Sequence, residues 1–324
     1  MDYQKIKILL DKIKLSAPKV LVLGDIMLDC YMNGSVRRIS PEAPVPILNY
    51  QNETSVLGGA GNVLHNLSNL GAKLGIASVI GNDLSGEQVM SLVENLKVPN
   101  DSIYISNETI TTKKTRFISY GTQLLRLDHD SKAVSGFPLE FLEKKILNRI
   151  LSFDCVVISD YGKGVCEDSM IQAIIKESNI QGIPTLIDPK GSSWNKYSKA
   201  TGITPNKREV EEKFNINLKI DEDFEKIAKI IINKYKLKFC LITRGADGMT
   251  YLEKNKIFHQ KVGKKEVFDV SGAGDTVISS LAASFCAGIK IENALALSSY
   301  ISSEVVTYAG TTPFHSRMLK KYER

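Results

Sequence analysis

Short apolar runs and amphipathic helical patterns alternate along most of this chain, and this alternation is the strongest constraint on its fold. The apolar runs are continuous, as is typical of strands buried on both faces of a parallel sheet. Because helical patterns lie between them, we expect an α/β fold with a mostly parallel central sheet flanked by helices. The expected strands cover residues 20–23, 75–80, 155–159, 185–187, 239–243 and 249–252, and the expected helices cover 139–151, 169–178 and 221–235.

Two regions depart from this pattern. Residues 34–50 are extended and punctuated by proline, and residues 102–128 read as threonine-rich strands in which polar and apolar residues alternate. Alternation predicts one buried and one wet face, so we expect these segments to form a small β-sheet lid outside the main core. An edge hairpin without a function is the alternative. No long linker or internal repeat divides the chain, so we expect one domain, residues 1–324, with the lid inserted in it.

The composition is that of a globular protein, with 43% hydrophobic and 24% charged residues, and it excludes disorder and coiled coil. The net charge of +6 is small and dispersed, which suits an anionic small-molecule substrate and argues against nucleic acid as a partner. Five cysteines lie far apart without a C-x-x-C pair, and the N-terminus lacks the apolar centre of a signal peptide. The longest uncharged stretch, residues 276–289, is too short to span a bilayer. We therefore expect a cytoplasmic protein with no membrane partner.

The strongest local motif is the run DVSGAGDT at residues 269–276, which is followed by a helix of small residues. Small residues let the backbone N–H groups of Gly272, Ala273 and Gly274 face one point, and the helix that starts there adds its positive dipole end. Such a site stabilises a phosphoryl group in transfer. Asp275 stands at this anion hole, where a carboxylate is suited to take the proton of an attacking hydroxyl. A glycine-rich turn with an Asp near a helix N-terminus is the alternative.

The rival phosphate-binding motifs fail on spacing. No segment supplies the G-x-x-x-x-G-K-[ST] pattern of a P-loop. A dinucleotide fingerprint needs a third glycine that neither Gly272-Ala273-Gly274 nor Gly59-Ala60-Gly61 provides. A nicotinamide oxidoreductase is therefore not favoured.

A second glycine cluster, residues 58–62, opens a predicted helix. Gly58 and Gly59 allow a polyol to approach the backbone closely, and the Asn62 amide offers both a donor and an acceptor. Asp25 follows the first predicted strand, at the edge where open α/β sheets bind ligands, and its carboxylate can accept hydrogen bonds from two sugar hydroxyls. Each residue alone is also explained as an ordinary turn residue.

The early glycine cluster, the late Gly-Ala-Gly-Asp run and the split β lid together resemble the ribokinase-like (PfkB) carbohydrate kinases over essentially the whole chain. Ser280 and Leu64 depart from the two family signatures without touching a reactive group. The resemblance implies a ribokinase-like fold and ATP as phosphoryl donor. It also implies an N-x-x-E element at residues 206–209, where Asn206 and Glu209 help to hold Mg²⁺ and the ATP phosphates, with Lys207 and Arg208 between them. The run T-x-G-x-x-G then lies along the nucleotide, through Thr243, Gly245 and Gly248.

Within that family, the run RISPEAPVP at residues 38–46 is similar to the D-glycero-β-D-manno-heptose 7-phosphate kinases, as are the segments around Asp25, Asp29, Asp160, Lys163 and Lys190. The resemblance implies phosphorylation of the anomeric O1 to the 1,7-bisphosphate, on the way to ADP-heptose for the lipopolysaccharide core. Many such kinases are fused to an adenylyltransferase with an H-x-G-H motif. This sequence has no such motif, so we expect a kinase-only protein or the kinase half of a longer one.

On this interpretation, Asp275 deprotonates the sugar hydroxyl and the 272–275 backbone steadies the γ-phosphoryl group. The substrate-binding residues are expected to be Asp25, Asp29, Gly58, Gly59, Asn62 and Asp160, with cations for the sugar phosphate from Lys114, Arg116 and Arg126 on the lid, and with Lys163 and Lys190 able to reach either phosphate. A solvated basic face is the alternative for the lid cations. A monovalent cation such as K⁺ is compatible with this site.

An open strand edge on the lid favours a homodimer. Three other functions stay open: a kinase for another sugar or sugar phosphate, a nucleoside kinase, and a sugar-nucleotide sensor that binds without turnover.

Overall fold

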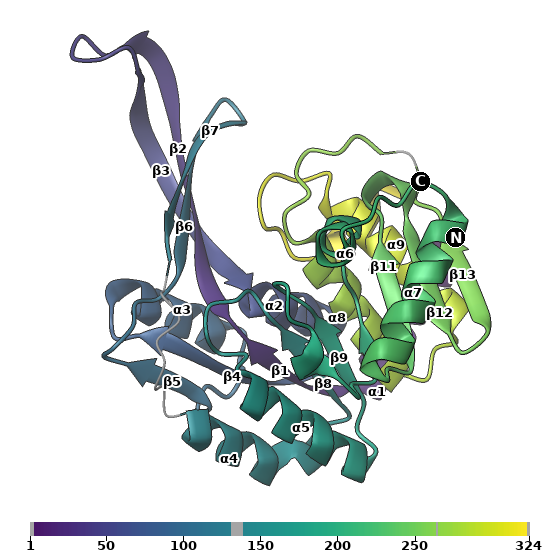
Figure 1. Ribbon diagram of the computed structural model, residues 1–324. Helices are drawn as coiled ribbons and strands as arrows, with labels where there is room; N and C mark the ends of the chain where they lie inside the picture. Colours follow the sequence, from purple (N-terminus) through teal and green to yellow (C-terminus); the bar gives the residue numbers. More distant parts are fainter. Residues whose placement is uncertain (1–2, 131–138, 264, 323–324) are drawn as a thin grey trace.

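In the computed structural model, which describes residues 3–130, 139–263 and 265–322, nine strands form one central sheet (Figure 1). The strand order is β13-β12-β11-β10-β9-β8-β1-β4-β5, and the strands from β11 to β5 pair in parallel, whereas β12 and β13 add antiparallel at one edge. These strands are β1 (Lys19–Gly24), β4 (Lys73–Gly81), β5 (Ile103–Ser106), β8 (Cys155–Ser159), β9 (Thr185–Asp188), β10 (Gly202–Ile203), β11 (Phe239–Thr243), β12 (Met249–Glu253) and β13 (Lys256–Gln260).

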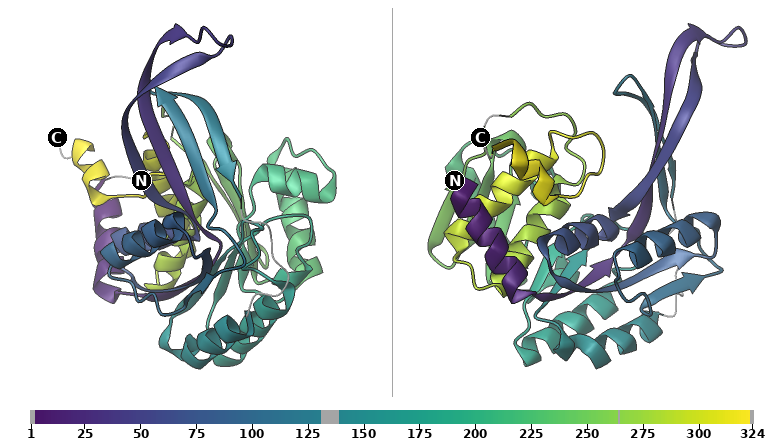
Figure 2. Two further views of the ribbon diagram at one scale, coloured as in Figure 1. Left: turned by 90° about the vertical axis from the view of Figure 1, so that its left-hand side faces the viewer. Right: turned by 180° about the vertical axis from the view of Figure 1, so that it is seen from behind.

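Helices cover both faces of the sheet, as the continuous apolar runs predict (Figures 1 and 2). Side chains of α1, α2, α3, α8 and α9 form one buried cluster, and side chains of α4, α5, α6 and α7 form the other. The helices are α1 (Tyr3–Ser16), α2 (Ala60–Leu70), α3 (Leu84–Asn95), α4 (Leu139–Arg149), α5 (Asp168–Gln181), α6 (Lys207–Phe214), α7 (Asp221–Tyr235), α8 (Ala273–Cys286) and α9 (Ile291–Val305).

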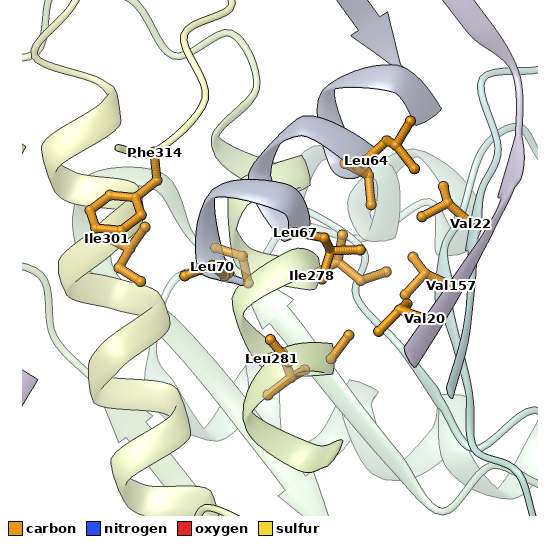
Figure 3. Close-up of a cluster of buried hydrophobic side chains, with 14 of the residues drawn as sticks. Val20, Val22, Leu64, Leu67, Leu70, Val157, Ile278, Leu281, Ile301 and Phe314 are labelled. Atoms are coloured by element: carbon orange, nitrogen blue, oxygen red, sulfur yellow. The ribbon is translucent and has the colours of Figure 1, made fainter. Parts of the chain in front are cut away.

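Strand β1 shows why the core lies on both faces. Val20 and Val22 belong to the cluster drawn in Figure 3, where they meet Leu67 of α2 and Ile278 of α8. The alternate residues of β1 point to the opposite face and join the other cluster. Burial of both faces explains why this strand is apolar throughout, and it fixes α8 against the sheet beside α2.

A second, four-stranded sheet of order β3-β2-β6-β7 rises from the ends of the central one (Figure 1). Strands β2 and β3 form a long antiparallel hairpin, β6 pairs with β2 in parallel, and β7 pairs antiparallel with β6. The strands are β2 (Ile26–Ile39), β3 (Pro46–Gly59), β6 (Lys113–Ser119) and β7 (Thr122–His129).

The bounds of this lid sheet differ from those expected from the sequence. The lid includes residues 26–33 and 51–59, which the alternation did not mark, because the first six residues of β2 are buried on both faces. Residues 103–106 were assigned to the lid, but they form β5, which pairs with β4 at the edge of the central sheet. A four-residue strand is too short for its pattern to show which sheet it joins.

None of the helices in the described residues is long and apolar enough to cross a bilayer.

Candidate active site

Three parallel neighbours of the central sheet end side by side, and their ends form the floor of the site. Gly24 of β1, Ser159 of β8 and Asp188 of β9 stand in register across the three strands. Asp25 and Asp160 follow the first two of these strands directly. Polar residues at the carboxyl ends of parallel strands are the usual ligand-binding edge of an open α/β sheet.

Asp275 lies in the first turn of α8 and is buried, with 3% of its surface exposed. Its Oδ2 accepts a hydrogen bond from Asn62 Nδ2 at 2.7 Å, and its Oδ1 accepts one from Tyr161 Oη at 2.8 Å. Burial raises the pKa of the Asp275 carboxyl to about 6, although both hydrogen bonds act in the opposite direction. A carboxylate with a pKa near neutrality, held from two sides, is suited to act as a general base.

Asn62 is held in the one orientation that lets it donate to Asp275. It lies in the first turn of α2, where Asn66 Nδ2 donates to its backbone carbonyl at 2.9 Å and to its Oδ1 at 3.2 Å. Asn66 Oδ1 in turn accepts from Thr276 Oγ1 and from the backbone N–H of Phe314. Because the Oδ1 of Asn62 is engaged, its Nδ2 is the atom that faces the carboxylate.

The glycines before α8 create the anion-binding turn. Gly272 has a φ of 78°, and a Cβ there would lie 2.5 Å from Asn62 Nδ2, so only glycine fits. In the described part of the chain, the N–H groups of Gly272, Gly274 and Asp275 have no hydrogen-bond acceptor. Ala273 differs from the expectation, because its N–H donates to the Val270 carbonyl at 3.2 Å. The free N–H groups and the α8 dipole form a site for an anion.

Asp25 has a structural task that the sequence did not predict. Its Oδ2 accepts from the backbone N–H groups of Tyr161 at 2.8 Å and Lys163 at 3.1 Å, and its Oδ1 accepts from that of Val165 at 3.0 Å. Burial and the nearby Asp160 raise the pKa of the Asp25 carboxyl, while the amide donors oppose the shift. Asp25 therefore holds the loop that follows β8, and contact with sugar hydroxyls stays a prediction.

Three more residues expected at the substrate, two after β8 and one after β9, are paired with side chains. Asp160 accepts from Tyr197 Oη at 2.6 Å and from Lys196 Nζ at 2.5 Å, and it is 3% exposed. Lys163 Nζ lies 2.7 Å from Asp130, and Lys190 Nζ lies 3.1 Å from Glu209. Each of these residues, expected at the substrate, therefore has an ionic partner in the folded chain.

The N-x-x-E element forms a capping box at the start of α6. Asn206 Oδ1 accepts from the Glu209 N–H at 2.9 Å, and Glu209 Oε2 accepts from the Asn206 N–H at 3.0 Å. This arrangement satisfies two N–H groups at the helix end. One turn further along the helix, Glu211 pairs with Lys207 and Glu212 pairs with Arg208. The Arg208 side chain lies on the surface.

The Thr243–Gly248 run lies beside this capping box. Thr243 ends β11 and forms an isolated bridge with Asn206, so the two elements expected at the nucleotide are adjacent. Gly245 and Gly248 have φ values of 61° and 94°. A Cβ at Gly248 would lie 2.0 Å from the Gln260 carbonyl oxygen, whereas nothing in the described structure lies within 4 Å of one at Gly245. Gly248 is needed by the fold, and Gly245 leaves room for a ligand.

The two glycines at the end of β3 pack closely against Asp29 and Asp25. A Cβ at Gly58 would lie 2.5 Å from Asp29 Oδ2, and one at Gly59, whose φ is 57°, would lie 2.4 Å from the Asp25 carbonyl oxygen. These positions therefore let β3 approach β2 at the base of the lid.

The lid carries three cations on one face, opposite two carboxylates. Arg116 Nη1 lies 2.7 Å from Asp29, and Arg126 lies 2.7 Å from Asp128. Lys114 stands in register with both carboxylates, yet no ion pair is assigned to it in the described residues. Its Nζ lies 5.9 Å from the centre of the Tyr161 ring, and burial lowers the pKa of its ammonium. Among the three cations, Lys114 is therefore the one without an assigned ion pair in the described residues.

Three residues of the site were not singled out from the sequence: Tyr161, Asn66 and Asp188. Tyr161 stands between Asp160 and Lys163, within one of the segments that resemble the heptose kinases. Asn66 stands one helical turn after Asn62. These positions are the only signals that the sequence offered for the two residues. Asp188 ends β9. Burial, together with the charges of Asp275 and Glu209, raises the pKa of the Asp188 carboxyl well above its usual value.

A buried carboxyl beside a glycine-rich helix N-terminus, with a β lid above a parallel sheet, is the arrangement of a small-molecule kinase of ribokinase-like architecture. Residues 17–317 match the model of the pfkB family carbohydrate kinases. The chain belongs to this family and is an ATP-dependent sugar kinase, which confirms the resemblance found in the sequence.

Several relatives carry the name Bifunctional protein HldE. The protein of that name from Sulfurimonas denitrificans is 39% identical over 313 residues, which cover 96% of this chain and 65% of the relative. The one from Helicobacter pylori is 38% identical over 298 residues, with 90% and 64% covered. The chain thus spans slightly less than two thirds of the length of these relatives.

Solved structures confirm the fold. Phosphofructokinase-2 from Escherichia coli in complex with potassium superposes with a TM-score of 0.78 at 19% identity, covering 95% of this chain and 98% of that one. Ribokinase from Arabidopsis thaliana complexed with ribose and ATP gives 0.72 at 18% identity, with 95% and 99% covered.

Proposed function

We propose that this kinase phosphorylates the anomeric O1 of D-glycero-β-D-manno-heptose 7-phosphate, forming the 1,7-bisphosphate on the way to ADP-heptose for the lipopolysaccharide core. The observation that carries the kinase mechanism is Asp275, which is buried at the N-terminus of α8 and fixed by Asn62 and Tyr161. The choice of sugar is supported by the RISPEAPVP run and by the identity with proteins named Bifunctional protein HldE.

In this mechanism, one oxygen of Asp275 accepts the proton of the O1 hydroxyl. The O1–phosphorus bond forms while the bond between the γ-phosphorus and the β–γ bridging oxygen breaks, and ADP leaves. The N–H groups of Gly272, Gly274 and Asp275 and the α8 dipole offset the charge on the transferring group. Losing the base costs at least about 3 kcal/mol of barrier, since general base catalysis contributes a factor of ~10² or more.

The carboxylates near the anion hole fit a Mg²⁺ ion. Asp188 and Glu209 are close enough for their charges to interact, and Lys190 Nζ, 3.1 Å from Glu209, is the cation beside them. Carboxylate oxygens are the donors that Mg²⁺ prefers. We assign the metal to Glu209 and Asp188, with Asn206 holding Glu209 through the capping box. A bound Mg²⁺ would neutralise charge on the β- and γ-phosphates.

A monovalent cation, K⁺, is an additional candidate cofactor. Comparison of the activity in K⁺ with the activity in tetramethylammonium tests whether the enzyme needs it.

Lys114 is the cation that we assign to the 7-phosphate of the sugar. On this face of the lid, Arg116 pairs with Asp29 and Arg126 pairs with Asp128. Lys114 lies in register with both carboxylates. A phosphate that enters this face would meet one positive charge without an ionic partner in the described structure. Lys114 Nζ lies 5.9 Å from the centre of the Tyr161 ring, and the hydroxyl of Tyr161 donates to Asp275, so the proposed phosphate site lies near the proposed base.

A homodimer is proposed through the edge of the lid sheet. β7 is an outer strand that is exposed along its whole length, and its Leu125 and Leu127 are 61% and 58% exposed. An open strand edge with apolar side chains is suited to pair with a second copy. Sedimentation equilibrium of the wild type and of Leu125→Glu tests the pairing: a dimer that becomes a monomer supports it, and a monomeric wild type contradicts it.

The cellular setting follows from the substrates. ATP as donor places the reaction in the cytoplasm, where the buried thiols of Cys30, Cys155, Cys166 and Cys240 stay reduced. We also propose that the 1,7-bisphosphate is finally consumed, after loss of one phosphate, by an adenylyltransferase that is either fused to this chain or separate. The 35% of the Sulfurimonas denitrificans relative outside the match leaves room for such a domain in that protein.

The test is ADP release with Mg-ATP and a panel of sugars: the manno-heptose 7-phosphate, sedoheptulose 7-phosphate, fructose 6-phosphate, ribose and adenosine. Selective turnover of the manno-heptose 7-phosphate is expected. Turnover of another member keeps the kinase mechanism and overturns the substrate. Binding of ATP without any turnover would favour a sugar-nucleotide sensor.

A further inference from the structure

Tyr161 links two buried carboxylates of the site. Its backbone N–H donates to Asp25 Oδ2 at 2.8 Å, and its hydroxyl donates to Asp275 Oδ1, also at 2.8 Å. The residue follows β8 directly after Asp160, whereas Asp275 belongs to α8, 114 positions further along the chain. Tyr161 therefore connects the end of the central sheet to the helix that carries the base.

The backbone around Tyr161 is fixed before its side chain acts. Asp25 accepts the N–H groups of Tyr161, Lys163 and Val165, and Asp160 accepts that of Gly162 at 2.7 Å. Four backbone N–H groups within residues 161–165 thus donate to the two carboxylates that follow β1 and β8. A loop held in this way sets the position of the Tyr161 ring without a contribution from the ligand.

The hydroxyl of Tyr161 can act on Asp275 only as a donor. Burial, followed by the charges of Asp275 and Asp188, raises the pKa of the Tyr161 phenol well above its usual value. The phenol therefore stays protonated over the working pH range. A donor to the charged form of a carboxyl stabilises that form, and it also stops rotation about the Cβ–Cγ bond of Asp275.

We propose that Tyr161 is a positioning residue that holds the Asp275 carboxylate ionised and oriented toward the sugar hydroxyl. This inference rests on the proposed role of Asp275 as the base. Asn62 performs the same task at the other oxygen, so the carboxylate is fixed at both ends. The other ionisable groups that act on Asp275 are Asp29 of β2, Lys114 of β6 and Asp188 of β9, and the variant below changes none of them.

The experiment compares Tyr161→Phe with the wild type in two ways. The first is the pH dependence of kcat for the sugar that the wild type phosphorylates. The second is NMR titration of ¹³C-labelled aspartate in the protein without sugar, with the Asp275 signal assigned by its loss in Asp275→Asn. We expect the apparent pKa of Asp275 to rise by about one to two units, because the variant removes a hydrogen bond to the charged form of the carboxyl. The rate should then fall more at pH 6.5 than at pH 8.5.

Tyr251→Phe is the matched control. Tyr251 is also buried, and it donates to a carboxylate, that of Glu253, at 3.2 Å on β12, away from Asp275. The Tyr251→Phe substitution should change neither the pKa of Asp275 nor the pH at which kcat falls on the acid side. An Asp275 pKa in Tyr161→Phe that equals the wild-type value would overturn the proposal.

The NMR titration needs no sugar, so it separates this inference from the proposed function. If no sugar is phosphorylated, the proposed function fails, and the titration still decides whether Tyr161 stabilises the carboxylate. If Tyr161→Phe does not fold, 3,5-difluorotyrosine at position 161 replaces it, because this residue keeps the bond with a more acidic hydroxyl. The pKa of Asp275 should then fall, and an unchanged value contradicts the proposal.

Discussion

Arg116 of β6 donates to Asp29 of β2 across 2.7 Å, and both side chains are buried. Thr311 Oγ1 donates to the second oxygen of Asp29 at 2.8 Å, and the Arg116 guanidinium stacks on the Tyr31 ring at 5.2 Å. The ion pair therefore joins two lid strands to the loop after α9. Arg116, which the sequence places at the sugar phosphate, is committed to this connection in the folded chain.

Asp29→Ala should lower the free energy of unfolding by about 3–5 kcal/mol, because it leaves the Arg116 charge buried without its partner. Urea denaturation measures the loss. The control is Asp128→Ala, which removes the acid of the exposed pair with Arg126 and should cost about 1 kcal/mol or less. Equal losses in both variants would show that the Arg116–Asp29 pair has no special weight.

Asp275→Asn should reduce kcat by a factor of ~10² or more, because an amide cannot accept the proton of the sugar hydroxyl. The affinity for ATP, measured by isothermal titration, should stay within a few-fold of the wild type. More than about a tenth of the wild-type kcat would rule out Asp275 as the base, since general base catalysis contributes at least this much.

The pH dependence of kcat should show an acid limb near pH 6, where burial places the pKa of Asp275. The base must be ionised to work, so activity is present above this pH and falls as the pH drops through it. A raised carboxyl pKa adds stability that is present at low pH and lost as the pH rises through about 6, so protonation of Asp275 does not unfold the protein. Circular dichroism at pH 5 checks this, and a flat profile from pH 5 to 8 would contradict the assignment.

Lys114→Met should raise KM for the sugar phosphate by about tenfold or more, because a charge-assisted hydrogen bond is worth ~1.5–3 kcal/mol. The KM for ATP should be unchanged. Lys113→Met is the matched control: it removes the neighbouring lysine of β6, which lies 4.0 Å from Glu53 and points to the other face of the sheet. An equal effect of the two variants would mean that general positive charge, and not Lys114, attracts the phosphate.

Glu209→Gln and Glu209→Ala separate the helix cap from the metal. Glutamine can still accept the Asn206 N–H, so thermal stability should hold while the Mg²⁺ concentration for half-maximal rate rises. Alanine removes the cap as well and should cost about 1 kcal/mol of stability in addition. An unchanged Mg²⁺ dependence in Glu209→Gln would exclude Glu209 as a metal ligand.

Much of the fold could be predicted because its signals are local. The apolar runs of β1, β8 and β11 and the helical periods of α5 and α7 lie within ten to fifteen residues, and each structural element appears close to its expected place. The helix start at residues 272–275 could be predicted in the same way, since Gly272 and Asp275 stand three positions apart at one helix N-terminus. Such features depend on neighbouring residues alone.

The contacts that make the site could not be predicted, because they join distant parts of the chain. Asn62 and Asp275 are separated by 213 positions, and Arg116 and Asp29 by 87. The sequence shows that these residues are polar and near turns, but not which of them meet. That is why the loop contacts of Asp25 were not expected, and why Tyr161 was not singled out.

The sequence by itself determined the setting of the proposed site: a glycine-rich turn with a carboxylate at a helix N-terminus, on a parallel α/β sheet with a lid. Only the tertiary structure decided which charges are compensated. Asp29 and Asp128 form ion pairs with two arginines, so Lys114, which is in register with both acids, has no assigned ion pair in the described residues. The packing of α8 beside β8 brings Tyr161 to Asp275. The physical reason is that secondary structure follows from the local pattern of side chains, whereas the pKa and the partner of a buried charge follow from everything packed around it.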